Sequence, residues 1–146
     1  MTFNSIEEMK TYIINKSKGA VQQAKEFVFK TMEDVLIQFY EEYDPSIYNR
    51  TFQMLCCCVQ TDVIPTANGW VAEIYFDSSK MNYTTDSQPS GESVLEAAKF
   101  GRHGAMGLAV VDFKGTPIME ESVIRLSKKI YPLIKSALIA NGIPVR

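Results

Sequence analysis

Apolar positions recur with helical periodicity along the first part of the chain. They fall mainly at three- and four-residue steps, at Ile6, Met9, Ile13, Ala20, Ala24, Phe27, Val28, Val35 and Phe39. This spacing keeps one face of a helix apolar, and Ser5 followed by Glu8 forms a capping box at its start. The pattern predicts a helix over residues 5–42, about 57 Å long if unbroken. So small a domain cannot cover such a helix, so we expect it to break near Gly19 or to pack partly on another subunit.

The apolar pattern changes to a period of two beyond Pro45, which ends the helix because proline disfavours helical geometry in the preceding residue. Residues 52–64 are rich in β-branched and sulfur-containing side chains, which predicts a first strand. Residues 70–77 then alternate, with Trp70 and every second residue after it on the predicted core face. Residues 65–69 read Pro-Thr-Ala-Asn-Gly, and their Asn-Gly pair tolerates positive φ. We therefore predict a β-hairpin.

The second half of the chain begins with a small, polar, breaker-rich segment at residues 84–93, which predicts an exposed loop. Ser93 would cap a short helix over residues 93–100, and Gly101 would end it in the left-handed conformation. The apolar run at residues 108–113 predicts a third strand.

A C-terminal helix is predicted after Thr116, its expected cap, with Pro117 at its first position and a kink at Pro132. Its buried stripe would consist of Met119, Val123, Leu126, Ile130, Leu133 and Ala137. The whole chain, residues 1–146, is thus predicted to be a single α+β domain. It would combine a long N-terminal helix, a small antiparallel sheet of about three strands built on the hairpin, a short helix and the C-terminal helix.

Composition narrows the range of partners. The chain is 46% hydrophobic and 22% charged, which is typical of a folded domain, and its net charge is -2. A mildly acidic chain lacks the basic stripe that binds a phosphate backbone, which argues against direct nucleic-acid binding. No run approaches the roughly 20 apolar residues of a membrane span, and the N-terminus has no basic-then-apolar signal. We therefore expect a protein that remains in the cytoplasm where it is made and has no membrane partner.

The candidate reactive groups do not form a recognisable catalytic or metal site. Cys56, Cys57 and Cys58 lie in the first predicted strand, where alternate side chains point to opposite faces, so they are expected to pack as reduced, apolar side chains. A thiol nucleophile would need His103, the single histidine, and a third group to orient its ring. A zinc site would need four convergent ligands. We predict no catalysis, no cofactor and no metal.

Two clusters remain as candidates for an interface or a structural corner. At the helix end, neighbouring carboxylates of Glu41, Glu42 and Asp44 point apart and predict a solvated terminus. The segment that follows concentrates aromatic rings around an arginine, which could stack on them to fix the corner or project to a partner. A glycine-rich segment at residues 101–107 predicts a tight turn or contact loop. The candidate residues are Tyr43, Pro45, Tyr48, Arg50, Arg102 and His103.

The order of elements and two short patterns resemble a known family. Tyr43, Pro45, Tyr48, Arg50 and Thr51 match a tyrosine, proline and arginine-threonine pattern, and Gly101, His103 and Gly104 match a glycine-histidine-glycine turn. Over most of its length the chain resembles the small tail-completion, minor tail or head-tail joining proteins of long-tailed bacteriophages and prophages. The predicted strand at residues 108–113 fits that family less well.

The resemblance implies a structural virion protein of the phage neck with no catalytic role. Such proteins form a ring, often a hexamer, between the connector and the tail tube, so the implied partners are further copies of the chain and connector, tail-terminator or tail-tube proteins. The implied location is the head-tail junction of the virion, after synthesis in the bacterial cytoplasm. The long helix with its corner, and the loops at residues 84–93 and 101–107, would supply the contacts. Two alternatives stay open: a bacterial cytosolic protein-binding module, and a small thiol-dependent enzyme that uses a cysteine with His103.

Overall fold

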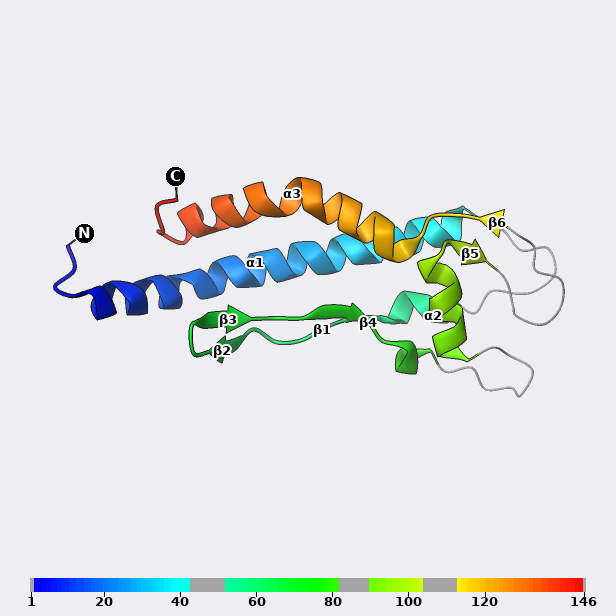
Figure 1. The fold of residues 1–146 in the computed structure, drawn as a ribbon, viewed down its shortest axis with the longest axis horizontal. Helices are drawn as coiled ribbons and strands as arrows, with labels where there is room; N and C mark the ends of the chain where they lie inside the picture. Colours follow the sequence, from blue (N-terminus) through cyan, green and yellow to red (C-terminus); the bar gives the residue numbers. More distant parts are fainter. Residues whose placement is uncertain (1, 43–51, 82–89, 104–112, 146) are drawn as a thin grey trace.

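The computed structural model describes residues 2–42, 52–81, 90–103 and 113–145. The fold is α+β, as predicted, with three helices, two 3-10 turns and three two-stranded antiparallel sheets in the described part of the chain (Figure 1). The elements, in chain order, are α1 (Ile6–Glu41), η1 (Gln53–Cys56), β1 (Cys58–Gln60), β2 (Ile64–Thr66), β3 (Gly69–Val71), β4 (Ile74–Phe76), η2 (Ser78–Lys80), α2 (Gly91–Lys99), β5 (Arg102–His103), β6 (Phe113–Lys114) and α3 (Ile118–Ala140).

Helix α1 is one continuous element of 36 residues, about 54 Å long. Its predicted cap is confirmed, because the Ser5 side chain accepts a hydrogen bond of 3.1 Å from the Glu8 amide. The expected break near Gly19 is wrong. A Cβ atom at Gly19 would lie 2.2 Å from Oδ1 of Asn141, so glycine at this position lets the end of α3 approach the helix closely.

The molecule is elongated because α1 runs along its whole length (Figure 1). Helix α3 packs antiparallel along one side of α1, the hairpin strands lie along the other side, and both chain termini lie at the same end of the molecule. Helix α1 therefore separates α3 from the hairpin. Both α3 and the hairpin extend along α1, so much of this long helix has a packing partner within the chain.

The predicted buried stripe of α3 is confirmed at Ala137 but is wrong at the start of the helix. Met119 and Val123 are 44% and 61% exposed, whereas Ile118 and Ser122 are buried. The Ser122 hydroxyl donates a 2.6 Å hydrogen bond to the Ile118 carbonyl, and this internal bond allows a polar side chain to occupy the buried stripe. The expectation for Met119 and Val123 is thus wrong because the hydropathy pattern reads Ser122 as a surface residue.

The ends of α3 also differ in detail from expectation. Pro117, and not Thr116, occupies the N-cap position. The helix continues through Pro132, and its ribbon changes direction near its middle in Figure 1, which agrees with the predicted kink.

The predicted hairpin is confirmed. Its outer part pairs Ile64 with Val71, its inner part pairs Cys58 with Phe76, and the hydrogen-bonded ladder is interrupted between them. Side chains from residue 70 to residue 76 alternate between half-buried and exposed as predicted. The first part of the predicted strand is wrong, because residues 53–56 form the turn η1. Phe52 precedes it with a φ of 54°, which turns the chain out of an extended path.

Helix α2 begins earlier than predicted and ends where expected. Its cap is Ser90, whose hydroxyl accepts a 3.2 Å hydrogen bond from the amide of Ser93, so Ser93 lies inside the helix. Gly101 follows the helix with a φ of 70°, and a Cβ atom there would lie 2.2 Å from the Gly115 carbonyl oxygen. Of the predicted third strand, only Phe113 falls within the described residues, where it pairs with β5.

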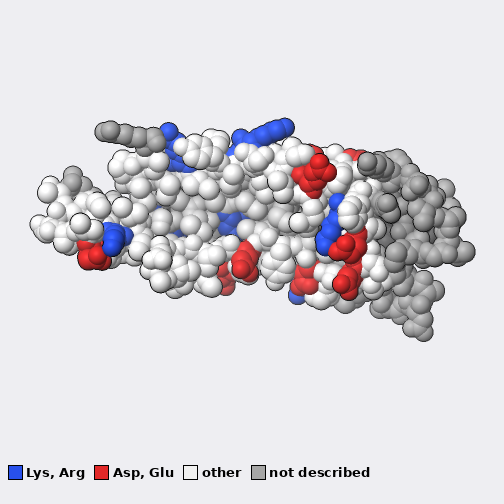
Figure 2. Space-filling view, viewed as in Figure 1, with Lys and Arg blue, Asp and Glu red and all other residues white. Residues whose placement is uncertain are grey.

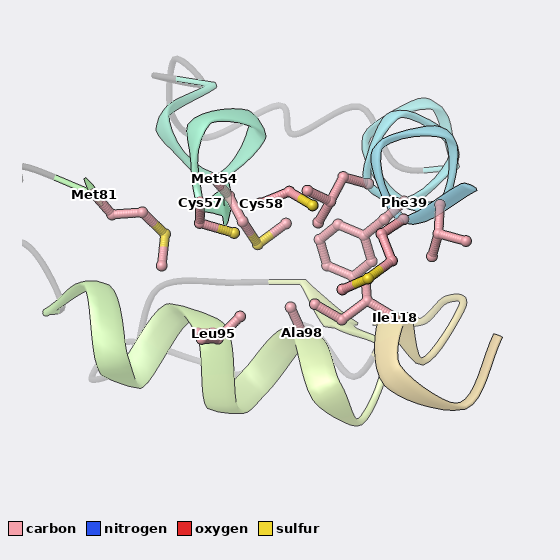
Figure 3. Close-up of a cluster of buried hydrophobic side chains, with 11 residues drawn as sticks. Phe39, Met54, Cys57, Cys58, Met81, Leu95, Ala98 and Ile118 are labelled. Carbon is pink, nitrogen blue, oxygen red and sulfur yellow. The ribbon is translucent and has the colours of Figure 1, made fainter. Parts of the chain in front are cut away.

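The hydrophobic core lies at the end of the molecule where α2 and η1 lie beside the C-terminal part of α1 (Figures 1 and 3). Its buried members are Met32, Val35, Leu36, Phe39, Met54, Cys57, Cys58, Met81, Leu95, Ala98 and Ile118. Figure 3 shows Leu95 and Ala98 pointing from α2 toward the sulfur-bearing side chains of the segment after α1. Unbranched methionines adapt to the irregular space between short elements, which suits a core built mainly from turns and helix ends.

Candidate functional site

The corner predicted from the sequence lies outside the described residues. Tyr43, Pro45, Tyr48 and Arg50 belong to residues 43–51, so their role stays a prediction. Arg102 and His103 form β5, and the backbone of this strand pairs with β6. The structure therefore places two candidate residues in a short sheet and leaves the other four untested.

The last turn of α1 forms a polar network with the start of α3. A carboxylate oxygen of Glu42 accepts a 2.7 Å hydrogen bond from the Thr116 amide, and the Thr116 hydroxyl also donates to this carboxylate. Gln38 donates from its side-chain amide to both Glu42 and Thr116, at 2.8 and 3.2 Å. The prediction of a solvated helix end is therefore wrong for Glu42. Its partner is 74 residues away in sequence, so no local pattern signals the contact.

Arg125 extends this network along α3. Its Nε donates a 2.7 Å hydrogen bond to Glu121 in an ion pair one helical turn away, and its guanidinium also donates to the Gln38 side-chain oxygen. Charge-assisted hydrogen bonds of this kind are stronger than neutral ones and depend on geometry. The network ties the C-terminal end of α1 to the start of α3.

The three cysteines differ in exposure. Cys56 is exposed, whereas Cys57 and Cys58 are buried in the core. The strict alternation expected for a strand is wrong here, because Cys56 ends the turn η1 and β1 starts only at Cys58. Burial raises the pKa of Cys57 to about 12, and burial also raises that of Cys58 to about 11. Both groups are protonated thiols at neutral pH, and a thiol is a poor nucleophile compared with a thiolate.

The described part of the chain can be compared with the requirements of a metal site and of a membrane span. Within those residues, no group of three or more His, Cys, Asp or Glu side chains is arranged to hold a metal ion. None of the described helices is both long and apolar enough to cross a membrane.

Helix α3 and the hairpin each carry several exposed apolar side chains, and others lie elsewhere, at Ile6, Met9, Ile13, Ile37, Phe52 and Phe100. On α3 the exposed apolar side chains are Met119, Val123, Ile124, Tyr131, Ile134 and Ile139, and we call this surface the α3 face. Tyr131 is the most exposed of them, at 69%. Because Ile118, Ser122 and Ala137 form the buried side of α3, the α3 face looks away from α1.

The second surface is the outer side of the hairpin. Ile64, Val71 and Tyr75 are exposed there, and we call this surface the hairpin face. The opposite side of the hairpin packs on α1, where the Trp70 indole N–H donates a 2.7 Å hydrogen bond to the Ile14 carbonyl. Lys18 also lies over the Trp70 ring, 5.0 Å from its centroid. Because side chains alternate along the chain here, a Trp70 anchored on α1 directs the intervening residues Val71 and Tyr75 away from α1.

The two surfaces flank the same long helix. The family model described as YomN matches residues 5–140. The chain belongs to the YomN family. This family is associated with phages and prophages, so the protein is phage-related, as the resemblance implied at the broader level. No curated protein and no solved structure matches the chain significantly.

The match to the YomN family covers α1, the hairpin, α2 and α3. It therefore includes both exposed apolar surfaces and the polar network. The apolar residues of these surfaces are visible in the sequence, but their exposure is not, because an apolar residue on a helix is more often buried than exposed.

Proposed function

We propose that this YomN family member is a structural protein of the phage neck, a head-tail joining or tail-completion component that assembles as a ring between the connector and the tail tube. The observation that carries the proposal is membership of a phage-associated family along residues 5–140. The proposed partners are further copies of the chain, with a hexamer as the expected ring, and the connector, tail-terminator or tail-tube proteins. The proposed location is the head-tail junction.

The distribution of exposed apolar side chains supports an assembly role. The α3 face and the hairpin face lie on opposite sides of α1, so one subunit offers two different apolar surfaces. A closed ring joins one surface of each subunit to a different surface of the next. Monomeric soluble proteins rarely expose large apolar patches, and such patches commonly mark interaction sites.

We also propose that the protein performs no catalysis. The raised pKa values of Cys57 and Cys58 disfavour the thiolate that a cysteine enzyme needs. Measurement of native thiol reactivity tests this proposal: Cys56 alone should react with a thiol reagent at neutral pH, and all three cysteines should react in denaturant. Rapid native modification of Cys57 or Cys58 would favour the thiol-dependent alternative.

The location can be tested in phage particles. The gene should be deleted from the phage or prophage that carries it, and the particles released after induction should be imaged. A neck component predicts filled heads and free tails that fail to join, and restoration of joining by the intact gene. In wild-type particles, antibody labelling should mark the head-tail junction.

A different outcome would point to the alternative function. Normal, joined particles without the protein would contradict a neck role. If the protein were then recovered from the host cytoplasm in complex with one host protein, its two apolar surfaces would be those of a cytosolic protein-binding module.

A further inference from the structure

Beyond residue 125, the α3 face carries charge opposite to that of the hairpin face, whereas the first turn of α3 contains Glu120 and Glu121. Residues 126–140, which form the larger part of α3, contain Lys128, Lys129 and Lys135 and no acidic residue. Residues 58–77, which form the hairpin, contain Asp62, Glu73 and Asp77 and no basic residue. Figure 2 shows lysine and arginine at the upper edge over the middle of α3, with acidic side chains nearer the start of that helix, and acidic side chains along the lower edge from the hairpin toward α2.

The charges on α3 lie among the exposed apolar side chains. Lys128 follows Ile124 by four residues and precedes Tyr131 by three, and Lys135 follows Tyr131 by four. Residues at these steps are neighbours on a helix surface. A line of alternating apolar and basic side chains thus runs along the α3 face.

The hairpin face has the matching arrangement. Val71, Glu73 and Tyr75 are exposed and lie at alternate positions, so an acidic side chain lies between two apolar ones on one side of the hairpin. Asp62 is exposed in the interruption between β1 and β2. The neighbouring Thr61 is bound to Glu73, which lies between β3 and β4: the Thr61 amide donates a 2.9 Å hydrogen bond to the Glu73 carbonyl.

These charges are not paired with one another inside one molecule. The ion pairs among the described residues join Lys10 with Glu7, Lys99 with Glu96 and Arg125 with Glu121. None of these ion pairs involves Lys128, Lys135, Asp62 or Glu73. Since α1 separates α3 from the hairpin, the two faces of one subunit cannot meet (Figure 1).

We propose that the hairpin face of one copy docks on the α3 face of the next copy. The charge complementarity identifies a second copy as the occupant, because each subunit presents both halves of the contact. Such a head-to-tail contact generates a ring or an open filament and not a two-fold dimer. This inference deepens the proposed function, since it rests on self-assembly and names the surfaces that would form the ring.

Charge-reversal variants test the pairing directly. The α3 variant carries Lys128→Glu with Lys135→Glu, and the hairpin variant carries Asp62→Lys with Glu73→Lys. We expect the wild-type chain to form oligomers in low salt, measured by size-exclusion chromatography with light scattering. Either variant alone should associate at least about tenfold more weakly, because like charges then face each other across the contact.

Mixing the variants provides the decisive measurement. In an equimolar mixture, the acidic α3 face of one variant meets the basic hairpin face of the other, and the remaining wild-type faces also complement each other. Assembly should therefore return in the mixture as an alternating oligomer, and it should also return in a chain that carries all four substitutions. Recovery in both cases requires the two faces to touch.

Matched controls separate this contact from general charge effects. Lys30→Glu together with Glu92→Lys reverses two exposed charges away from both faces and should leave assembly unchanged. Tyr131→Ala tests the apolar part of the contact and should weaken association even in high salt, where charges are screened. Circular dichroism should show that each variant is folded.

Three results would overturn the proposal: a wild-type chain that stays monomeric at its highest attainable concentration, folded single-face variants that assemble like wild type, or a mixture of folded variants that stays dissociated. The neck role is tested separately in phage particles. A neck ring whose assembly ignores these substitutions would contradict this contact alone, whereas charge-dependent oligomers of a protein absent from the neck would contradict the neck role alone.

Discussion

The two ends of the molecule differ in how they use apolar side chains. At one end, which we call the core half, the C-terminal part of α1 packs with η1, β1, α2 and the start of α3, and it contains the hydrophobic core cluster. At the other end, which we call the arm, the N-terminal part of α1 lies with the hairpin tip and the end of α3. There the buried apolar residues are Ala20, Ala137 and Ile143, whereas Ile6 and Ile13 are 69% and 41% exposed.

This difference assigns separate roles to two ends of one helix. Burial of apolar surface supplies most of the free energy of folding, so the core half should determine the stability of the domain. The arm is held by small residues in close contact, by Trp70 and by one face of α3, and its remaining apolar surface is available to a partner. Substitutions should therefore have large effects on stability in the core half and small ones in the arm.

The largest effect is expected for Leu36→Ala, in the centre of the core half. Leu36 is 1% exposed, so its truncation should lower the free energy of unfolding by about 2–5 kcal/mol through lost burial and a cavity. Ile37→Ala is the matched control, because Ile37 is 46% exposed and its truncation should change stability by less than about 1 kcal/mol. Urea denaturation measures both values. Equal losses in the two variants would contradict the assignment of the core.

Alkaline pH should weaken the core half through its buried thiols. The pKa values of about 12 for Cys57 and 11 for Cys58 lie above the ordinary value of 9.0, so the unfolded chain loses these protons first. The contribution of these two protonated thiols to the free energy of unfolding is fully present below pH 9, and it decreases as the pH rises toward 11 to 12. The expected loss is up to about 1.4 kcal/mol per pH unit for each thiol.

A double variant isolates the contribution of these two thiols. Cys57→Ala with Cys58→Ala should have a flatter dependence of stability on pH between 9 and 11 than wild type, in urea denaturation at each pH. Cys56→Ala should retain the wild-type slope, because Cys56 is exposed. Identical slopes in the wild type and the double variant would show that the two thiols titrate normally in the fold.

The polar network that joins the core half to α3 should have an intermediate effect. Glu42→Gln keeps the shape of the side chain and removes the charge that accepts hydrogen bonds from Thr116, so we expect a loss of about 1–2 kcal/mol. Glu41→Gln alters an exposed carboxylate next to it and should change stability by less than about 0.5 kcal/mol. Thermal or urea unfolding of the two variants measures both changes in stability. A larger loss for Glu41→Gln would mean that the network does not hold α3.

The smallest global effect is expected in the arm. Trp70→Phe removes the indole N–H that binds the Ile14 carbonyl, and this carbonyl keeps a second donor in the Ser17 hydroxyl, so the loss should be about 1 kcal/mol or less. Hydrogen exchange at residues 64–71 should nevertheless become faster, because the hairpin tip loses its anchor. Tyr75→Phe, on the exposed face, should leave exchange unchanged. Unaltered exchange in Trp70→Phe would show that the tip is held by other contacts.

Local patterns in the sequence were sufficient to predict most of the elements. The helical period over residues 5–42, the capping box at Ser5 and the alternation after Trp70 each arise within one element, and each is present in the structure. Gly101 likewise ends α2 in the left-handed conformation that was predicted. These features depend on backbone geometry and on neighbours a few residues apart, so they can be read without knowledge of the fold.

Contacts between distant residues decided the rest. Helix α1 continues through Gly19, which leaves room for Asn141, Glu42 binds Thr116, and Ser122 lies in a buried stripe. Nothing near these residues in the sequence indicates those environments. The exposure of the two surfaces proposed for assembly also depends on contacts between distant residues. The sequence by itself determined that α3 and the hairpin are amphipathic and oppositely charged. Only the tertiary structure decided which of their apolar residues remain exposed, because α1 covers one side of each element and leaves the other side free.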